Sequence, residues 1–537
     1  MLFNSTEFIL VFLPVTLTGF LLLRRFSRGV ALGWLILASI AFYAWWRPIN
    51  LLIIIPSVLV DFALARLMVL WADKPSRAIW RTGLLVVGLV LNVALLGYFK
   101  YTTFFQMAAN DIIGTNFTLT HVVLPLGLSF ITFQKIAFLV DVHGGQIERF
   151  SFREYCLFVL FFPQVIAGPI VHFREMMPQF RNLPRRLDVP LLTAGVALFV
   201  IGLFKKVVLA DSMAEHVNPI FQSAGLDGAP SLIPAWLAAL GFTTQIYFDF
   251  SGYSDMASGL ALCVGVRLPL NFDSPLKATN IIDFWSRWHI TLTRFLTAYV
   301  YNPLALSATR RRLKRGKPGL APKRFSAGAF ASVLAGPTLF TMFISGFWHG
   351  AGYMFILWGL LHGGYLVVNH LWRRLGPRVW MDEERYDLFM KPVGLILTFF
   401  SVVLAMVVFR APNMDVALQI FRGMLGLNGL ELPRSLVDML GIAGQLPSFV
   451  GVTSISLQAI GALAALLGIA MLLPNSMQFT ARYTPVLGVE RPSSESRILY
   501  RLLDFQPSVV WALIMSLLAL VAFARFGGPS EFLYWQF

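Results

Sequence analysis

Charged residues are scarce in this 537-residue chain, where Asp, Glu, Lys and Arg together account for 13% of the sequence. A soluble domain carries about 25% charged residues, which it needs to cover a surface that faces water. Hydrophobic residues make up 57% of the chain. This composition excludes a soluble globular enzyme and a disordered chain. It predicts a polytopic integral membrane protein.

Cysteine is almost absent, with only Cys156 and Cys263, both in apolar stretches. Two cysteines exclude a disulfide framework and a cysteine-based metal site, and we expect both to be small core residues and no bound metal. The apolar N-terminus also lacks a basic leader and a small-residue cleavage site before Arg24. We therefore expect it to be a retained first span and not a cleaved signal peptide.

Several long runs contain no Asp, Glu, Lys or Arg. A helix crosses a bilayer with about 20 apolar residues, whereas the strands of membrane barrels alternate polar and apolar residues. These runs are continuous, so they predict an all-α membrane fold with about 11–13 membrane segments, some of them re-entrant. The runs are 29–46, 82–99, 228–248, 392–409, 505–524 and the longest, Phe325 to Trp372, which is long enough for two crossings and a turn.

Acidic residues are outnumbered by basic ones, 27 against 43, which gives a net charge of +16. The basic residues cluster between apolar runs, as expected for positive loops on the cytoplasmic side. We therefore explain the excess by topology and anionic lipid and expect no nucleic-acid partner. Two spans separate the first two clusters, which predicts an extracytoplasmic N-terminus. The clusters are Arg24/Arg25/Arg28, Lys74/Arg77/Arg81, Arg181/Arg185/Arg186 and Arg310 to Arg324.

Flexible linkers and internal repeats are also missing. We therefore predict one integral domain, 1–537, without an attached soluble catalytic domain. The largest polar interruption, 307–324, is expected to be a basic cytoplasmic loop. Residues 411–455 hold no clear span and are compatible with an amphipathic helix.

In a chain with so few charges, the polar residues within apolar runs are the most informative about function. Each is costly in lipid unless it is paired or hydrated. His349 lies in the middle of the longest charge-free run, in Gly346-Phe-Trp-His-Gly-Ala-Gly352. Three glycines weaken a helix there, and a broken helix at membrane depth is tolerated where it lines a cavity. A neutral imidazole at such a site is a usable general base. Alternatively, His349 is a buried histidine bonded to a backbone carbonyl.

His289 lies in a second polar segment, Asp283 to Arg294. At helical spacing the segment has a charged face that includes Asp283 and Arg287 and an aromatic face that includes Trp285 and Trp288. This pattern predicts an interfacial helix. On the residues alone, His289 is either a functional group or a helix-surface residue in the headgroup zone.

The third polar segment is Gln245 to Asp255. At helical spacing Asp249 and Tyr253 are neighbours, as are Ser251 and Asp255. Two acids in an apolar span need protons, partners or water. They could polarise a histidine or cap a broken helix, or they could join helices by polar packing.

Taken together, these segments resemble the membrane-bound O-acyltransferase superfamily, in its alginate O-acetyltransferase-like bacterial branch. The dense core of the resemblance covers 121–371. The blocks that carry it, in order, are Leu124 to Gln134, Phe162 to Ile170, Gln245 to Asp255, Arg267 to Pro275, Asp283 to Arg294 and Phe347 to Ala351.

The resemblance implies a helical ring around a central tunnel that links the two membrane faces. It also implies that His349 is the catalytic residue and His289 the second active-site histidine. The C-terminal tail, 529–537, is similar to an aromatic motif whose tyrosine accepts the acyl group, so Tyr534 is a candidate relay; on composition alone the tail is an interfacial aromatic belt. The residues expected to position donor and acceptor are Trp348, Trp285, Trp288, Arg287, Asp249, Tyr253, Asp255, Gln245, Asn271 and Asp273.

The implied activity is transfer of an acetyl group from cytoplasmic acetyl-CoA, used as a co-substrate without a further cofactor, to an extracytoplasmic polysaccharide such as alginate or cellulose. The implied location is the bacterial inner membrane. The expected partners are a periplasmic SGNH or esterase-like acetyltransferase and the polysaccharide synthesis and export machinery. Alternatives are an acyltransferase for peptidoglycan, lipid or teichoic-type acceptors, and a transporter or flippase, although paired broken helices in two related halves are not evident.

The chain departs from the family pattern after Tyr301-Asn-Pro-Leu304. A short glycine-rich loop is common in the family at this point, whereas here Ala-Leu-Ser and the basic run to Arg324 follow. This segment is expected near the cytoplasmic mouth. Its basic residues have either a topogenic role or a role in attracting the phosphates of CoA.

Overall fold

The computed structural model describes residues 1–527 except 121, 187, 227, 321–325, 380–382, 443–445, 448–449 and 489–503. The described chain forms two compact units. The first contains 1–204, 252–271 and 476–526, and the second contains 205–251, 272–475 and residue 527. Helix α12 (Leu232–Cys263) contributes to both.

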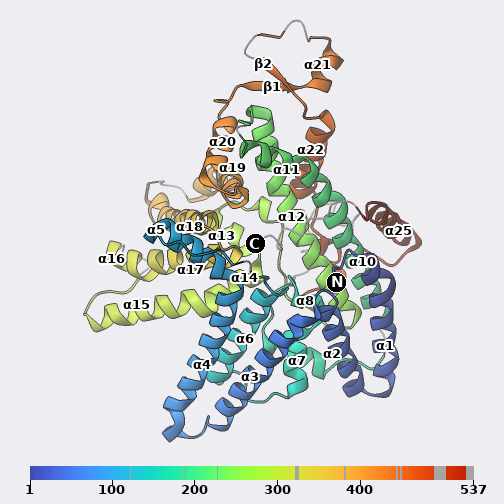
Figure 1. Ribbon diagram of the computed structural model, residues 1–537, viewed down its shortest axis with the longest axis vertical. Helices are drawn as coiled ribbons and strands as arrows, with labels where there is room; N and C mark the ends of the chain where they lie inside the picture. The colour runs from blue at the N-terminus through green and yellow to red at the C-terminus, as the bar shows by residue number, and fades with distance from the viewer. Residues whose placement is uncertain are drawn as a thin grey trace. The chain divides into compact units, whose positions relative to one another are not determined.

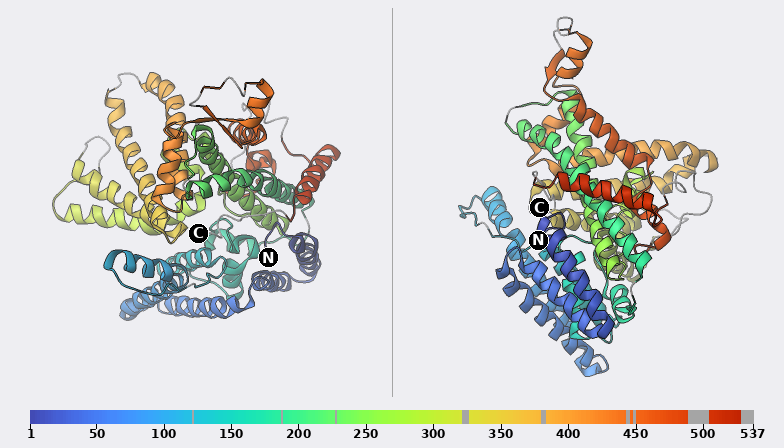
Figure 2. Two further views of the ribbon diagram at one scale, coloured as in Figure 1. Left: turned by 45° about the horizontal axis from the view of Figure 1, so that its top comes forward. Right: turned by 90° about the vertical axis from the view of Figure 1, so that its right-hand side faces the viewer.

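The first unit is helical, and Figures 1 and 2 show its N-terminal helices in blue to cyan as neighbours, with α1 against α2 and α3 and α4 against α6. Its α-helices are α1 (Leu13–Phe26), α2 (Arg28–Ala44), α3 (Leu51–Leu70), α4 (Ala78–Leu96), α5 (Thr102–Ile113), α6 (Leu128–His143), α7 (Phe152–Leu160), α8 (Phe162–Val165), α9 (Phe173–Arg181), α10 (Val189–Phe204), α23 (Ser476–Phe479) and α25 (Val509–Ala524). Short π or 3₁₀ turns occupy Phe8–Phe12, Pro48–Asn50, Pro75–Arg77, Gly97–Tyr101 and Ala481–Tyr483.

The second unit is helical apart from a two-stranded parallel sheet, β1 (Leu430–Pro433) with β2 (Val450–Thr453), in which Leu430 pairs with Val450. Its helices are α11 (Asp211–Ala224), α13 (Ile281–Arg287), α14 (Ile290–Leu296), α15 (Asn302–Lys314), α16 (Ala327–Ala329), α17 (Gly336–His349), α18 (Tyr353–Val379), α19 (Glu383–Arg410), α20 (Met414–Met424), α21 (Arg434–Leu440) and α22 (Leu457–Leu472). Short π or 3₁₀ turns occupy Lys205–Ala210, Pro275–Lys277, Thr297–Tyr301 and Phe330–Ala335.

The predicted all-α membrane fold is confirmed. In the described residues, seven helices are long and apolar enough to cross a membrane, and three shorter apolar helices, Arg28–Ala44, Leu457–Leu472 and Val509–Ala524, accompany them. The predicted total was 11–13, and the ring with a central tunnel stays a prediction. The spans are Phe8–Phe26, Pro48–Leu70, Pro75–Ile113, Val189–Ala224, Ala327–His349, Tyr353–Leu375 and Glu384–Arg410.

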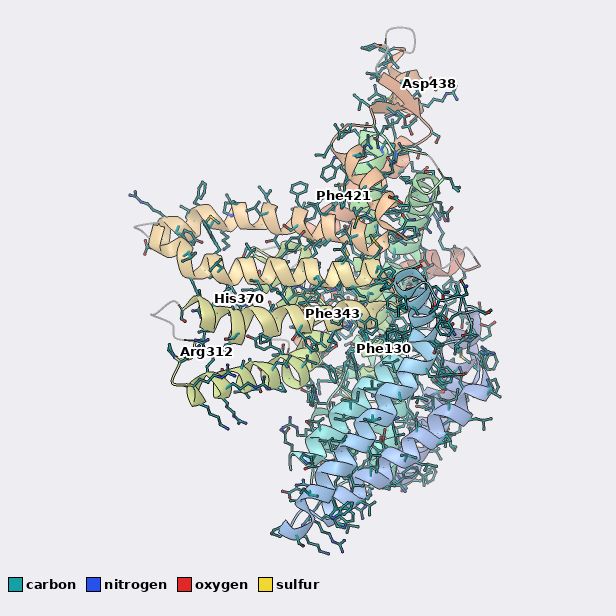
Figure 3. All side chains as sticks on the ribbon, turned by 60° about the vertical axis from the view of Figure 1, so that its left-hand side comes forward. Phe130, Arg312, Phe343, His370, Phe421 and Asp438 are labelled. Carbon is teal, nitrogen blue, oxygen red and sulfur yellow. The ribbon has the colours of Figure 1, made fainter. Side chains whose placement is uncertain are left out.

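The longest charge-free run forms a helical hairpin of α17 and α18 with its turn at 350–352, as predicted. Phe343 on α17 and His370 on α18 mark these neighbouring helices in Figure 3. Glycines allow the close approach: a Cβ on Gly346 would collide with the carbonyl oxygen of Phe355, and one on Gly359 with that of Met342. Small residues at a helix contact let two backbones pack tightly in lipid.

The basic segment 307–324 was predicted to be a loop, and for its first part this is wrong. Helix α15 runs through Lys314, because Ala, Leu and Arg favour helices. The helix ends at Arg315 and Gly316, and Gly316 adopts a positive φ of 64° that suits glycine. The basic residues Arg310, Arg311 and Arg312 are therefore presented on a helix.

A buried ionic cluster in the first unit was not predicted. The Lys135 ammonium on α6 lies 3.0 Å from the Asp61 carboxylate on α3, and both side chains are 2% exposed. Asn92 on α4 donates its amide hydrogens to the same carboxylate, at 3.0 and 2.9 Å from its two oxygens. The cluster joins three helices. The sequence signal for it was an acid and a lysine near the middle of two largely apolar segments.

Candidate active site

His349 lies at the C-terminal end of α17, and its side chain is buried at 4% exposure. The next residue, Gly350, has an extended backbone (φ −159°, ψ 149°), and a Cβ there would collide with the Phe355 ring. Helix α17 therefore stops at the turn of the hairpin. This places the imidazole beside the irregular backbone that the three glycines predicted.

Three aromatic rings surround the His349 imidazole. Ring centroids of Trp348, Trp358 and Phe409 lie 4.9, 5.0 and 5.5 Å from it, in edge-to-face arrangements with interplanar angles of 66°, 89° and 77°. These rings come from α17, α18 and α19. A histidine enclosed by aromatic rings is shielded from water, which strengthens its hydrogen bonds and charge interactions.

The predicted continuous interfacial helix over Asp283 to Arg294 is wrong. The segment breaks into α13 and α14 at His289, whose backbone is left-handed (φ 43°, ψ 51°). A left-handed residue other than glycine costs about 1–2 kcal/mol, and such strain persists only where the surroundings enforce it. The break changes the helical phase, so His289 is fully buried and not on a surface in the headgroup zone.

Both predicted active-site histidines lie in the second unit, and their rings are neighbours tilted by 56°. Their centroids are 6.4 Å apart, and the Trp348 centroid lies 6.0 Å from His289. The Phe250 ring on α12 packs perpendicular to His289 at 4.7 Å. Two imidazoles, one at the end of α17 and one at the break between α13 and α14, can therefore contact one small reacting group.

Local hydrogen bonds hold the α13 segment that leads to His289. The Asn280 side chain caps α13 by accepting from the Asp283 N–H at 3.0 Å, and Arg287 pairs with the Asp283 carboxylate at 2.7 Å. The Arg287 carbonyl accepts from the Asp273 N–H at 2.9 Å, and Asn475 donates to the Asp273 carboxylate at 2.8 Å.

Trp288 is buried, and its ring stacks on Phe284 with centroids 5.8 Å apart and planes 13° apart. These contacts give Arg287, Asp273 and Trp288 structural partners.

Asp249 on α12 has an ionic partner that was not predicted. Its carboxylate lies 2.6 Å from the Lys206 ammonium, which also lies 2.7 Å from Asp211. The Lys206 and Asp249 side chains are each 1% exposed. Asp249 is thus balanced by a cation. Gln245, one turn earlier on α12, is buried at 2% exposure, and its side-chain oxygen has no hydrogen-bond partner among the described residues.

Three other predicted positioning residues belong to the first unit. The Tyr253 ring stacks on Phe3 with centroids 4.8 Å apart, Asp255 accepts from the Ser476 hydroxyl at 2.6 Å, and Asn271 donates to the Ser254 hydroxyl at 3.0 Å. Their roles in positioning a substrate stay predictions. Tyr534 and the tail 529–537 lie outside the described residues.

Sequence reasoning did not single out His362 and Trp358, which follow His349 on α18. His362 is fully buried, with its ring 4.8 Å from Trp358 and 5.3 Å from Trp285 on α13. Within the described part of the chain, neither His362 ring nitrogen has a hydrogen-bond partner, nor do the indole nitrogens of Trp285 and Trp358. A buried polar group left unsatisfied costs about 1–3 kcal/mol. The signal was available, because His362 shares the charge-free run of His349.

The arrangement is suited to acyl transfer. One buried imidazole can take a proton from a hydroxyl, and a second can orient the reacting groups within reach of the first. Buried N–H donors beside them could bind carbonyl oxygens. Among the described residues, no group of three or more His, Cys, Asp or Glu side chains is placed to hold a metal ion.

Comparison with known proteins agrees with this chemistry. Residues 77–317 match the model of the MBOAT, membrane-bound O-acyltransferase family, a range that includes His289. The chain is 39% identical over 464 residues to the peptidoglycan O-acetyltransferase of Helicobacter pylori, covering 80% of this chain and 81% of that protein. It is 35% identical over 442 residues to the probable alginate O-acetylase of Pseudomonas aeruginosa, covering 80% and 76%.

A more distant relative is named for a different acceptor. The teichoic acid D-alanyltransferase of Streptococcus thermophilus is 26% identical over 293 residues, which cover 53% of this chain and 68% of that protein. All three relatives are named for transfer of an acyl group, acetyl in two of them and D-alanyl in the third. The chain therefore belongs to the membrane-bound O-acyltransferase family and is an integral membrane O-acyltransferase.

Proposed function

We propose that this enzyme transfers an acetyl group from cytoplasmic acetyl-CoA to an extracytoplasmic polysaccharide across the bacterial inner membrane. The observation that carries the proposal is the pair of buried imidazoles, His289 and His349, with ring centroids 6.4 Å apart beside Trp348. Support for the acetyl group comes from two relatives named for O-acetylation.

In the proposed reaction, His349 is the general base. It takes the proton of an acceptor hydroxyl while the oxygen attacks the thioester carbonyl carbon. A C–O bond forms, the C–S bond breaks, and the protonated His349 returns its proton to the leaving thiolate to give free CoA. His289 and Trp348 hold donor and acceptor in register, and such positioning can supply several kcal/mol.

The acceptor is a hydroxyl of an envelope glycan. An exopolysaccharide of the alginate or cellulose type is the first candidate. Peptidoglycan is the second candidate, and it is supported by the 39% identity to a peptidoglycan O-acetyltransferase. A periplasmic SGNH or esterase-like acetyltransferase would complete transfer to either polymer, together with its synthesis and export machinery. The N-terminus is extracytoplasmic in this proposal.

We expect membrane vesicles that contain the enzyme to release free CoA from labelled acetyl-CoA when the donor is supplied on the cytoplasmic side. Label should appear on glycan fragments or on the protein at the opposite face. In a reaction without glycan, label can appear only on the protein, so this reaction distinguishes the two acceptors. Transport of intact acetyl-CoA, or no CoA release with any glycan, would contradict the proposed donor.

Tyr534 is proposed as the relay that accepts the acetyl group before the polymer does. Replacing Tyr534 with Phe removes the attacking oxygen, so we expect loss of label on the protein and loss of acetyl export to glycan. Mass spectrometry of the C-terminal peptide measures the first quantity. The matched control is Tyr483→Phe, outside the tail. Full export by Tyr534→Phe would eliminate the relay and leave His349 as the base.

A further inference from the structure

A second cluster of side chains with buried polar atoms adjoins His349. Trp358 packs edge-on against His349 with centroids 5.0 Å apart, and His362 packs on Trp358 at 4.8 Å. Trp285 closes the cluster at 5.3 Å from His362 and 5.9 Å from Trp358. Trp358 and His362 are separated by one turn of α18, and Trp285 comes from α13. The cluster is therefore continuous with the candidate active site but is not part of the histidine pair.

The three side chains of this cluster are closed off from water and carry polar atoms. Exposure is 6% for Trp285, 1% for Trp358 and 0% for His362. Both His362 ring nitrogens and both indole nitrogens lack hydrogen-bond partners within the described residues. Neutral histidine offers one donor and one acceptor, and each indole offers one donor. Since buried polar groups are nearly always paired in proteins, this set is complementary to a ligand group that both donates and accepts.

We propose that His362, with Trp285 and Trp358, binds the amide of the acyl donor that lies nearest to the thioester. This assignment rests on the proposed function. In an acyl-CoA, an ethylene spacer separates the thioester sulfur from an amide. An amide supplies one N–H and one carbonyl oxygen, which matches an acceptor nitrogen on His362 and the donors of the indoles. With the thioester at His349, the amide would lie beside Trp358 and His362.

The test compares two truncated donors. S-Acetyl-N-acetylcysteamine keeps the amide, and S-pentyl thioacetate replaces it with an alkyl chain of the same length. We expect the wild-type enzyme to prefer the amide donor in kcat/KM by about 10–100-fold, because a site built for hydrogen bonds rejects an analogue that lacks them. His362→Leu should lower kcat/KM for the amide donor by a similar factor and leave the alkyl donor nearly unchanged. His362→Gln, which keeps a donor and an acceptor, should restore part of the preference.

His370→Leu on the same helix is the matched control, since His370 is half-buried two turns beyond His362 (Figure 3). An equal loss on both donors in His362→Leu would overturn the assignment, because it would mean a general role in catalysis or packing. An unchanged preference in that variant would overturn it as well. Failure of the proposed function is distinguishable, because then the wild-type enzyme would transfer no acetyl group from acetyl-CoA itself.

Discussion

Replacing His349 with Ala is expected to lower acyl transfer by about 10²–10⁴-fold, the usual contribution of a positioned general base. The imidazole is buried among Trp348, Trp358 and Phe409 and lies 6.4 Å from His289 between ring centroids. Without it, the acceptor hydroxyl keeps its proton during attack on the thioester. The measurement is CoA release from labelled acetyl-CoA by purified enzyme in detergent.

The variant must remain folded for this result to concern chemistry. His349→Gln keeps much of the side-chain volume and should lose activity to a similar extent, because an amide cannot act as a base near neutral pH. His370→Ala on α18 is the control and should retain activity. Membrane insertion and thermal unfolding are measured for all three variants. Normal turnover by well-folded His349→Ala would show that another residue takes the proton.

Replacing Lys135 with Met is expected to destabilise the first unit by about 3–5 kcal/mol, because removal of one member of a buried ion pair leaves the other charge uncompensated. Asp61 would then keep the two hydrogen bonds from Asn92 but lose the cation at 3.0 Å. The measurement is thermal unfolding in detergent, with the fraction of inserted protein as a second readout.

The double variant Asp61→Asn with Lys135→Met provides the decisive comparison. It removes both charges and keeps a side-chain oxygen to accept from Asn92, so we expect it to recover most of the lost stability. Lys391→Met, at an exposed position on α19, is the control for loss of a lysine. If the double variant is as unstable as Lys135→Met, the cluster acts through side-chain packing and not through charge balance.

Much of the fold follows from local sequence. The charge-free runs around α2, α4, α19 and α25 matched helices, because length and apolar composition are properties of one segment. The glycines of Gly346 to Gly352 predicted the end of α17, because they disfavour helix regardless of what packs against them. Periodicity failed at His289, since a single left-handed residue resets the helical phase of everything after it.

The candidate site was only partly predictable for a related reason. His349 and His289 were identifiable from charge scarcity and family resemblance, but sequence spacing does not say that their rings meet. For Asp249 the sequence left open a histidine, a helix cap or polar packing between helices, and the structure pairs it with Lys206, more than forty positions earlier in the chain. Pairing of buried charges depends on which helices become neighbours, and periodicity within one helix carries no such information.

The sequence by itself determined that this protein is a largely helical membrane protein with a histidine in its longest charge-free run, because bilayer solvation acts on each segment separately. Only the tertiary structure decided that His289 is buried opposite His349, that Lys135 neutralises Asp61, and that His362 joins two tryptophans beside the histidine pair. These contacts arise when helices distant in the chain pack together. The stabilisation that these contacts provide comes from excluding water and lipid between specific side chains. It therefore arises only after the helices have assembled.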